Sequence, residues 1–333
     1  MKKLFAFALA LVLMLSATSA FALTIGFSQI GQESDWRTAN TDDIRSKLPA
    51  EGWDLLYDDA QQLQQNQINA LRRFITLDVD YILFTAVTGE GWDEVLKEVN
   101  DAGIPLILID RMPVQETLDQ IEYAAAFGGD FVEEGRRMGY WTARYLESVG
   151  RGDEEVNVVL LEGTTGSAAA VDRTTGIVEA FDNYPNLKIV AQQTGNFTRA
   201  EGQAVMESWL KSIDKIDVLL AENDDMGLGA IDAIKAAGLV PGVDIIIVGC
   251  DAVKVAHEAV FAGEMNATIE CNPLYSASVI KVIKGLEAGE VYGRDVMHPD
   301  ESVYDAVGGI PSDESGELLS ILVDQEILDT RQY

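Results

Sequence analysis

The sequence predicts an α/β protein with two doubly wound parallel sheets, each covered by helices on both faces. Short apolar runs alternate with amphipathic segments along nearly the whole chain, which is the pattern of parallel strands joined by helical crossovers. The runs Ile104–Ile109 and Ile245–Val248 are almost continuously apolar, as strands buried on both faces require. With 333 residues, 47% of them hydrophobic, the chain is long enough for two such units.

Nine strands are expected from the apolar runs, and helices are expected between them. In chain order the strands are Thr24–Ser28, Trp53–Tyr57, Tyr81–Thr85, Pro105–Asp110, Val156–Leu161, Leu187–Ala191, Val218–Ala221, Asp244–Gly249 and Ala267–Glu270. Apolar residues recur every three or four positions in the intervening segments, which predicts amphipathic helices. These segments include Gln64–Leu77, Gly91–Ala102, Phe131–Ser148 and Asp225–Ala237.

The first 22 residues are predicted to be a signal peptide. Lys2 and Lys3 form a basic start, an apolar run follows, and Ala20-Phe21-Ala22 provides an A-x-A cleavage motif. Cleavage after Ala22 would leave a mature chain that begins at Leu23. Because the apolar run is too short to span a bilayer, we expect an exported, periplasmic protein with no membrane insertion of the mature chain.

Charge and cysteine content restrict the possible partners. The net charge is −31, or −33 once Lys2 and Lys3 are removed. Such a surface repels nucleic acids and anionic lipids, so neither is an expected partner. Cys250 and Cys271 are the only cysteines. An oxidising compartment permits one disulfide between them, and two buried free thiols are the alternative.

Polar side chains follow five of the predicted strands, at the strand ends where open α/β sheets bind ligands. Carboxylates accept hydrogen bonds from neighbouring hydroxyls, guanidinium groups donate in a fork, and an indole covers the apolar face of a sugar ring. The set therefore predicts a monosaccharide site. It consists of Trp36, Arg37, Asp110, Arg111, Arg173, Asn223 and Asp251.

Each of these residues also has a purely structural interpretation. Asp251 could cap a helix, Trp36 could belong to the core, and Arg173 could form a surface ion pair. The predicted site therefore depends on the agreement between five strand ends, because none of the residues is decisive alone.

Catalytic functions have weaker support. With only His257 and His298, the chain offers neither a His-rich metal cluster nor a convincing Ser-His-Asp set, and it has no phosphate-binding loop motif. Asp110 and Asp251 could form a glycosidase pair, but polar or arginine neighbours should hold both ionised. We expect no enzyme activity, no cofactor and no metal.

Seven segments spanning nearly the whole mature chain carry a family pattern. They are GFSQIGQESDWRTAN (26–40), LDVDYILFTAV (77–87), GIPLILIDR (103–111), LEGTTGSAAAVDRTTGIVEAF (161–181), GNFTRAEGQAVMESWL (195–210), ENDDMGLGAIDAIKAAG (222–238) and IVGCDAVKVAHEAVFAGEMNATIE (247–270). Together they resemble the type I periplasmic sugar-binding proteins of ABC importers, the ribose and galactose type, and the QESDWR motif resembles the galactofuranose-binding branch.

The resemblance implies two lobes joined by a three-strand hinge, with the sugar between them. Lobe one would comprise residues 23–126 and 272–302, and lobe two residues 127–271 and 303–333. The hinge would lie near Phe127–Gly129, Cys271–Pro273 and Glu301–Tyr304. The branch motif adds Glu33 to the predicted site. Lobe one would supply Trp36, Arg37, Asp110 and Arg111, and lobe two Arg173, Asn223 and Asp251.

The resemblance also implies a monomer that delivers a monosaccharide to a membrane permease. A sensing receptor for a chemoreceptor or kinase would share this fold, and an exported hydrolase is a further alternative. The related sugar-responsive repressors would need a DNA-binding segment, which the export signal and the acidity disfavour. Two departures concern the sugar: Cys271 stands where ribose binders have Gln, and Asp130-Phe131 stands where the family usually has Asp-Asn.

Overall fold

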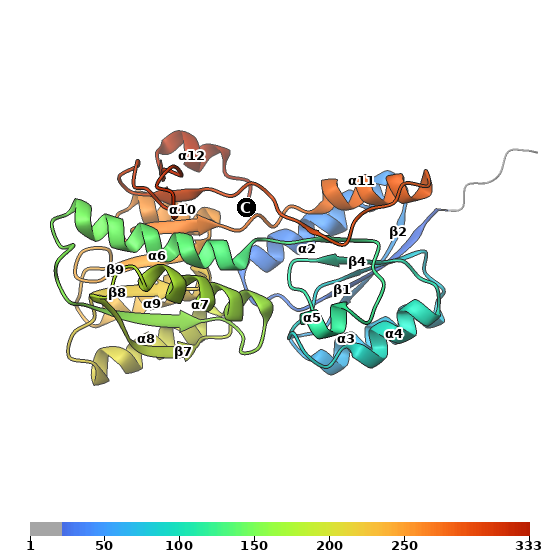
Figure 1. Cartoon of the computed structure of the whole chain (residues 1–333), viewed down its shortest axis with the longest axis horizontal. Coiled ribbons are helices and arrows are strands. Elements are labelled where there is room, and N and C mark those ends of the chain that lie inside the picture. Colours follow the sequence, from blue (N-terminus) through green and yellow to red (C-terminus); the bar gives the residue numbers. More distant parts are fainter. Residues whose placement is uncertain (1–21) are drawn as a thin grey trace, which may run out of the picture.

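The computed structural model describes residues 22–333. These residues form two α/β lobes that lie side by side along the long axis of the molecule (Figure 1). The predicted signal peptide, apart from Ala22, lies outside the described residues. Within residues 22–333, none of the helices combines the length and apolar character needed to cross a membrane.

The first lobe contains a six-stranded sheet in the order β11-β5-β4-β3-β1-β2, and all its neighbouring strands are parallel. Helix α2 packs with α11, and α3 packs with α4 on the opposite face (Figure 1). The strands are β1 (Thr24–Gln29), β2 (Asp54–Asp59), β3 (Tyr81–Phe84), β4 (Leu106–Ile109), β5 (Ala125–Phe127) and β11 (Val296–Met297). The helices are α2 (Asp35–Lys47), α3 (Gln64–Thr76), α4 (Asp93–Asp101), α5 (Gln115–Leu118) and α11 (Ser276–Glu287), with a 3₁₀ turn at Pro49–Glu51.

The second lobe contains a seven-stranded sheet in the order β13-β12-β10-β9-β8-β6-β7. Its strand pairs are parallel except for β10 with β12. The strands are β6 (Val156–Glu162), β7 (Leu187–Thr194), β8 (Val218–Ala221), β9 (Ile246–Asp251), β10 (Ala267–Glu270), β12 (Val303–Asp305) and β13 (Ile321–Leu322). The helices are α6 (Phe131–Ser148), α7 (Ala168–Phe181), α8 (Arg199–Ser212), α9 (Asp224–Ala236), α10 (Lys254–Phe261) and α12 (Gln325–Thr330).

The two lobes repeat one strand order. The first lobe reads β2-β1-β3-β4-β5 and the second β7-β6-β8-β9-β10, so in each sheet the order reverses beside its first strand. Open α/β sheets bind ligands at the carboxyl ends of the strands near such a reversal. The prediction of two doubly wound sheets is confirmed, and the antiparallel strand β12 is a departure from it.

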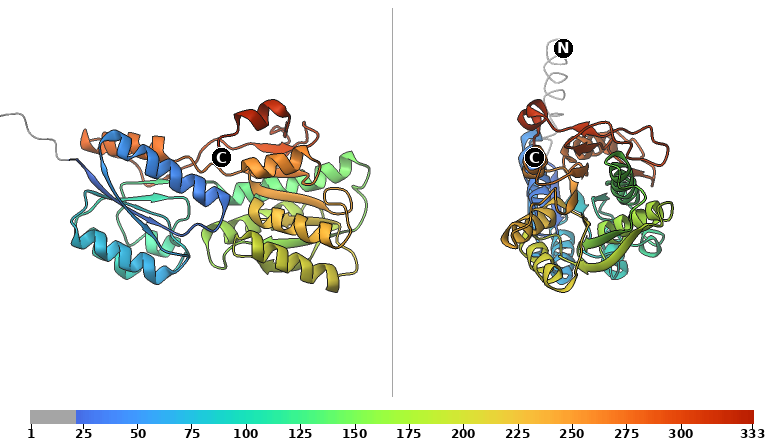
Figure 2. Two further views of the ribbon diagram at one scale, coloured as in Figure 1. Left: turned by 180° about the vertical axis from the view of Figure 1, so that it is seen from behind. Right: turned by 90° about the vertical axis from the view of Figure 1, so that its left-hand side faces the viewer.

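Three segments connect the lobes, as Figure 2 shows from behind. They lie between β5 and α6, between β10 and α11, and between β11 and β12. Val303 and Tyr304 belong to β12, so the third connection ends earlier than the predicted hinge segment Glu301–Tyr304. The lobe boundaries themselves, 23–126 with 272–302 and 127–271 with 303–333, stay a prediction.

Close packing of α6 on α7 positions charged residues beside the cleft. A Cβ atom on Gly135 would lie 2.1 Å from the carbonyl oxygen of Arg173, and one on Gly176 would lie 1.9 Å from that of Val132. Only glycine allows the two backbones to approach this closely. The contact brings Glu134 of α6 next to Arg173 of α7, where they form a buried ion pair.

Candidate ligand-binding site

A small cavity lies between the lobes. All the predicted site residues line it except Glu33, which pairs with the two lobe-one arginines. The structure therefore brings together side chains from five strand ends. The first and last of them, Trp36 and Asp251, lie more than two hundred residues apart in sequence. The lining residues are Ser34, Trp36, Arg37, Asp110, Arg111, Phe131, Ala169, Arg173, Phe197, Asn223, Asp251 and Cys271.

The start of α2 explains why Trp36 and Arg37 are adjacent. Ser34 caps the helix, because its side chain accepts a hydrogen bond from the Arg37 backbone N–H. The side chains of Trp36 and Arg37 line the cavity, where both are buried, whereas Asp35 between the cap and Trp36 is exposed. The Arg37 guanidinium carbon lies 4.6 Å from the Trp36 ring centroid, a cation–π distance. The indole Nε1 donates to the Cys271 carbonyl oxygen over 2.6 Å.

Two arginines and two acids form a buried charge cluster on the first lobe. Arg37 Nε lies 3.0 Å from Glu33 Oε1, and Arg37 Nη1 lies 2.7 Å from Asp110 Oδ2. Arg111 Nη2 reaches Glu33 Oε1 at 3.4 Å. Burial opposes the charge on Arg37, but Asp110 and Glu33 together raise its pKa.

Arg111 is the least satisfied member of that cluster. Burial and the neighbouring Arg37 lower its pKa to about 10, and its Nε and Nη1 atoms are buried without a hydrogen-bond partner. Its guanidinium lies 4.5 Å from the ring centroid of Phe197 on the second lobe. A Cβ atom on Gly163 would collide with that ring at 1.8 Å, so Gly163 makes room for Phe197. Arg111 therefore has free donors at the cavity wall.

The second lobe places Arg173 among acceptors. Arg173 Nε lies 2.7 Å from Glu134 Oε2, and Nη2 lies 3.3 Å from Asp251 Oδ1. Nη1 also donates to the Glu222 carbonyl oxygen. Burial raises the pKa of Asp251 well above its ordinary value, although Arg173 opposes the shift. Burial therefore opposes the ionised state of Asp251 that its arginine neighbour favours, and the charge of this carboxyl group stays a prediction.

Asn223 has a clear structural role at the cavity. Its side chain caps α9 by accepting from the Met226 backbone N–H over 3.0 Å. Its Nδ2 donates to the Phe197 carbonyl oxygen over 3.1 Å. Both polar atoms of the side chain therefore have protein partners, and a contact between Asn223 and a ligand stays a prediction.

The two aspartates share an unusual backbone conformation. Asp110 has a φ of 60° and Asp251 a φ of 117°, and each stands at the carboxyl end of a central strand, β4 and β9. Positive φ is rare outside glycine, and such residues cluster at ligand sites where the surrounding structure holds them. This conformation turns both carboxyl groups into the cleft.

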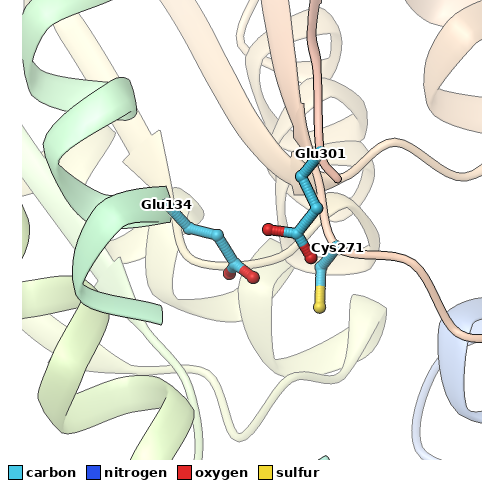
Figure 3. Close-up of side chains that lie close together, drawn as sticks. All are labelled: Glu134, Cys271 and Glu301. Atoms are coloured by element: carbon cyan, nitrogen blue, oxygen red, sulfur yellow. The ribbon is translucent and has the colours of Figure 1, made fainter. Parts of the chain in front are cut away.

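One group of side chains within residues 22–333 has the spacing of metal ligands. It consists of Glu134, Cys271 and Glu301. Their ligating atoms all lie within 4.8 Å of one another, and Figure 3 shows the two carboxyl groups facing each other beside the thiol. Burial and the charge of Glu134 raise the pKa of Glu301 to about 10, and burial raises the pKa of Cys271. Because Arg173 already pairs with Glu134 and burial raises the pKa of Glu301, a protonated Glu301 fits this cluster better than a cation.

Both cysteines are buried and free in the structure, which favours the free-thiol alternative over a disulfide. Cys250 contacts the acidic cluster from β9, with its Sγ 3.5 Å from Glu134 Oε2. Burial raises the pKa of Cys250 well above its ordinary value. The thiols therefore behave as small buried groups beside the cavity.

Comparison with known proteins agrees with this architecture. Residues 25–290 match the family model described as a periplasmic binding protein domain. The chain belongs to the periplasmic binding protein family. Within this family, galactofuranose-binding protein YtfQ of Escherichia coli strain K12 is 40% identical over 291 residues, which cover 86% of this chain and 87% of YtfQ.

Two solved structures superpose well on this one. The first, from Mycobacterium smegmatis in complex with β-D-fucofuranose, has a TM-score of 0.81 and 47% identity, and the match covers 85% of this chain and 91% of that chain. The second is the periplasmic binding protein component of the arabinose ABC transporter from Shewanella sp. ANA-3, bound to α- and β-L-arabinofuranose. Its TM-score is 0.78 at 38% identity, and the match covers 85% of this chain and 91% of that one.

Sequence reasoning missed Phe197 and Glu134 at the cleft of this periplasmic binding protein, and it named Phe131 only as a departure from the family pattern. Phe197 follows β7, so the rule of searching strand ends would have found it. Phe131 follows β5, a strand of three residues that was not predicted. Glu134 gave no signal in the sequence, because its position depends on the contact of α6 with α7.

Proposed function

We propose that this periplasmic binding protein binds one monosaccharide in its furanose form between the two lobes and delivers it to an ABC importer. The observation that carries the proposal is the buried cavity that both lobes line with charged groups and aromatic rings. The furanose form is favoured because two similar solved proteins hold furanose sugars and YtfQ is named for galactofuranose.

The side chains fit the hydroxyl pattern of a sugar. Arg111 has two unpartnered buried nitrogens, which can donate to ring or hydroxyl oxygens. Asp110 and Asp251 have carboxyl oxygens that can accept from neighbouring hydroxyls. Phe131, Phe197 and Trp36 supply apolar faces for the carbon side of the ring. The set recognises the sugar through reversible hydrogen bonds and leaves it chemically unchanged.

The cellular context completes the proposal. The signal peptide would be cleaved after Ala22, and the mature chain would act as a periplasmic monomer that presents its sugar-bound form to a transporter permease. A sensing receptor for a chemoreceptor or sensor kinase would use the same site. Genes for a permease and an ATPase beside this one would favour transport, and a signalling partner gene would favour sensing.

A thermal-shift screen with sugar-free protein tests the binding. The protein is unfolded, dialysed and refolded to remove bound sugar, and then heated with pentoses and hexoses that include arabinose, fucose and galactose. A bound sugar raises the unfolding temperature, because binding adds RT ln(1 + [L]/Kd) to the free energy of unfolding. No stabilisation by any sugar, or conversion of the bound sugar, would contradict the proposal.

The ring form is tested separately with a ¹³C-labelled anomeric carbon. The ¹³C NMR signal of the bound sugar distinguishes furanose from pyranose, and the proposal predicts a furanose signal. A methyl furanoside and the matching methyl pyranoside provide locked controls. A clear preference for the pyranoside would overturn the furanose form while leaving sugar binding intact.

A further inference from the structure

Apart from contacts made by the connecting segments, such as that of Trp36 with Cys271, two hydrogen bonds among the described residues join the lobes. The Gly89 backbone N–H donates to the Gly166 carbonyl oxygen over 2.8 Å. At the start of α2, the Asp35 backbone N–H donates to Asp225 Oδ2, also over 2.8 Å. Figure 2 shows α2 running from the first lobe toward the second (left view). The second contact is the more informative, because it uses a side chain that substitution can alter.

Asp225 has no other hydrogen-bond partner among the described residues. Asn223 caps α9, and Asp224 accepts from the Val253 N–H and the Thr268 hydroxyl within the second lobe. Asp225, although only 7% exposed, bonds only to the opposite lobe. As an acidic residue of the first turn it also complements the α9 dipole, but its side chain makes no hydrogen bond to the described residues of the second lobe.

The start of α2 offers a free backbone donor to an acceptor on the opposite lobe. The first N–H groups of a helix lack partners within the helix, and the helix dipole makes that end positive. The Ser34 side chain satisfies the Arg37 N–H, which leaves the Asp35 N–H for another acceptor. Asp225 supplies that acceptor, and the donor Asp35 directly precedes Trp36 and Arg37 of the cavity wall.

We propose that Asp225 is an interlobe latch, a positioning residue that holds the closed form around the sugar by accepting a hydrogen bond from the Asp35 backbone. This inference rests on the proposed function. Opening the cleft breaks the bond, so the latch stabilises only the closed form and slows release of the sugar. It contributes nothing to the encounter of the sugar with the open protein.

The charged surroundings of Asp225 add a pH dependence. The groups that face it are Asp35 and Glu33 near the start of α2, Arg199 of α8, Asp224 of α9 and Asp251 of β9. Burial raises the pKa of Asp225 to about 6, whereas the hydrogen bond from Asp35 lowers it. In an open cleft the carboxyl group is solvated and its pKa returns toward 3.8. Closure then takes up a proton, so this residue favours closure more as the pH falls through 6.

Substitution of Asp225 by Ala and by Asn tests the latch. Stopped-flow tryptophan fluorescence gives the association and dissociation rates with whichever sugar the wild type binds. We expect Asp225→Ala to release the sugar at least about tenfold faster, with an association rate within about twofold of wild type. Asp225→Asn keeps an acceptor oxygen, so its release rate at pH 7 should stay within about threefold of wild type. Its affinity should also change less than that of wild type between pH 7 and pH 5.

Asp42→Ala is the matched control, because Asp42 is exposed on α2 and its loss changes the charge equally. This variant should release sugar like wild type. Unfolding temperatures of the sugar-free variants show that each is folded, and rescue by Asn separates the lost acceptor from a general packing defect. If the wild type binds sugar and Asp225→Ala releases it at the wild-type rate, the latch is overturned while the proposed function stands. No sugar binding by the wild type would overturn the proposed function and the latch with it.

Discussion

The indole Nε1 of Trp36 donates a hydrogen bond to the carbonyl oxygen of Cys271 over 2.6 Å. Trp36 belongs to α2 in the first lobe, and Cys271 begins the connection that follows β10. Both residues line the cavity. Trp36 is therefore hydrogen-bonded to a segment that connects the lobes. This bond gives Trp36 a structural role in addition to its proposed contact with the sugar.

Trp36→Phe should lower both stability and affinity. Phenylalanine keeps an aromatic ring but leaves the buried Cys271 carbonyl oxygen without its donor, which should cost about 1–3 kcal/mol of unfolding free energy. Chemical denaturation measures this loss, and calorimetry measures sugar affinity. Trp92→Phe is the control, since Trp92 is buried in the same lobe and donates to the Thr88 carbonyl oxygen over 2.6 Å. It should lose similar stability and keep wild-type affinity, and equal affinity losses in both variants would contradict the role of Trp36.

Asp110→Ala and Asp251→Ala should each weaken sugar binding by about 2–4 kcal/mol, because each removes a buried hydrogen-bond acceptor and leaves buried hydroxyls unpaired. Titration calorimetry measures the change. Asp78 is the control for backbone strain, since it has a φ of 51° but is exposed and does not line the cavity. Asp78→Ala should leave affinity unchanged. A loss below about tenfold for both cavity variants, or about 1.4 kcal/mol, would mean that the site is misplaced.

Arg111→Met should lower the sugar affinity without lowering the stability of the fold. The guanidinium is buried with two unpartnered nitrogens, and an apolar side chain of similar length removes that cost, while Glu33 keeps Arg37 as its partner. The sugar-free protein should be as stable as wild type or about 1–4 kcal/mol more stable, and its affinity should fall more than about tenfold. Arg72→Met, at an exposed ion pair of the same lobe, should change neither the stability nor the sugar affinity. A less stable Arg111→Met variant that still binds sugar would refute this.

Stability should fall as the pH rises above about 5. Burial raises the pKa of Glu222 from 4.5 to about 8, so between these values the folded state holds a proton that the unfolded state has lost. The unfolded state then binds fewer protons, and the free energy of unfolding decreases with rising pH. Glu222→Gln should flatten this dependence in denaturation curves measured from pH 5 to 8. Glu147→Gln, at an exposed position of α6, should leave the slope unchanged, and an unaltered slope in Glu222→Gln would contradict the assignment.

The sequence predicted those parts of the fold that follow from local patterns. A strand buried on both faces appears as an apolar run, so β8 (VLLA) was located to the residue. The bounds of β10 (ATIE) were also predicted to the residue, although half of its residues are polar. β11 and β13 have only two residues each, too few for any periodicity. The antiparallel pairing of β12 with β10 depends on how the chain returns to the second lobe, which no local pattern encodes.

The site was predictable where its residues directly follow strands. Asp110, Asn223 and Asp251 obey that rule. Glu134 does not, because packing at Gly135 and Gly176 brings it to Arg173. The raised pKa of Asp251 was also unpredictable, since neighbouring charges can be guessed from sequence but the degree of burial requires the assembled lobes.

Small-angle X-ray scattering of the wild type, sugar-free and saturated with the sugar found by thermal shift, tests the central claim most directly. A sugar held by Arg111 of one lobe and Arg173 of the other stabilises the closed form, so saturation should shift the population toward closure. The account predicts a smaller radius of gyration with sugar, and no such decrease for Asp110→Ala at the same sugar concentration. An unchanged radius in a wild type that demonstrably binds sugar would contradict a site between the lobes that closes on its ligand.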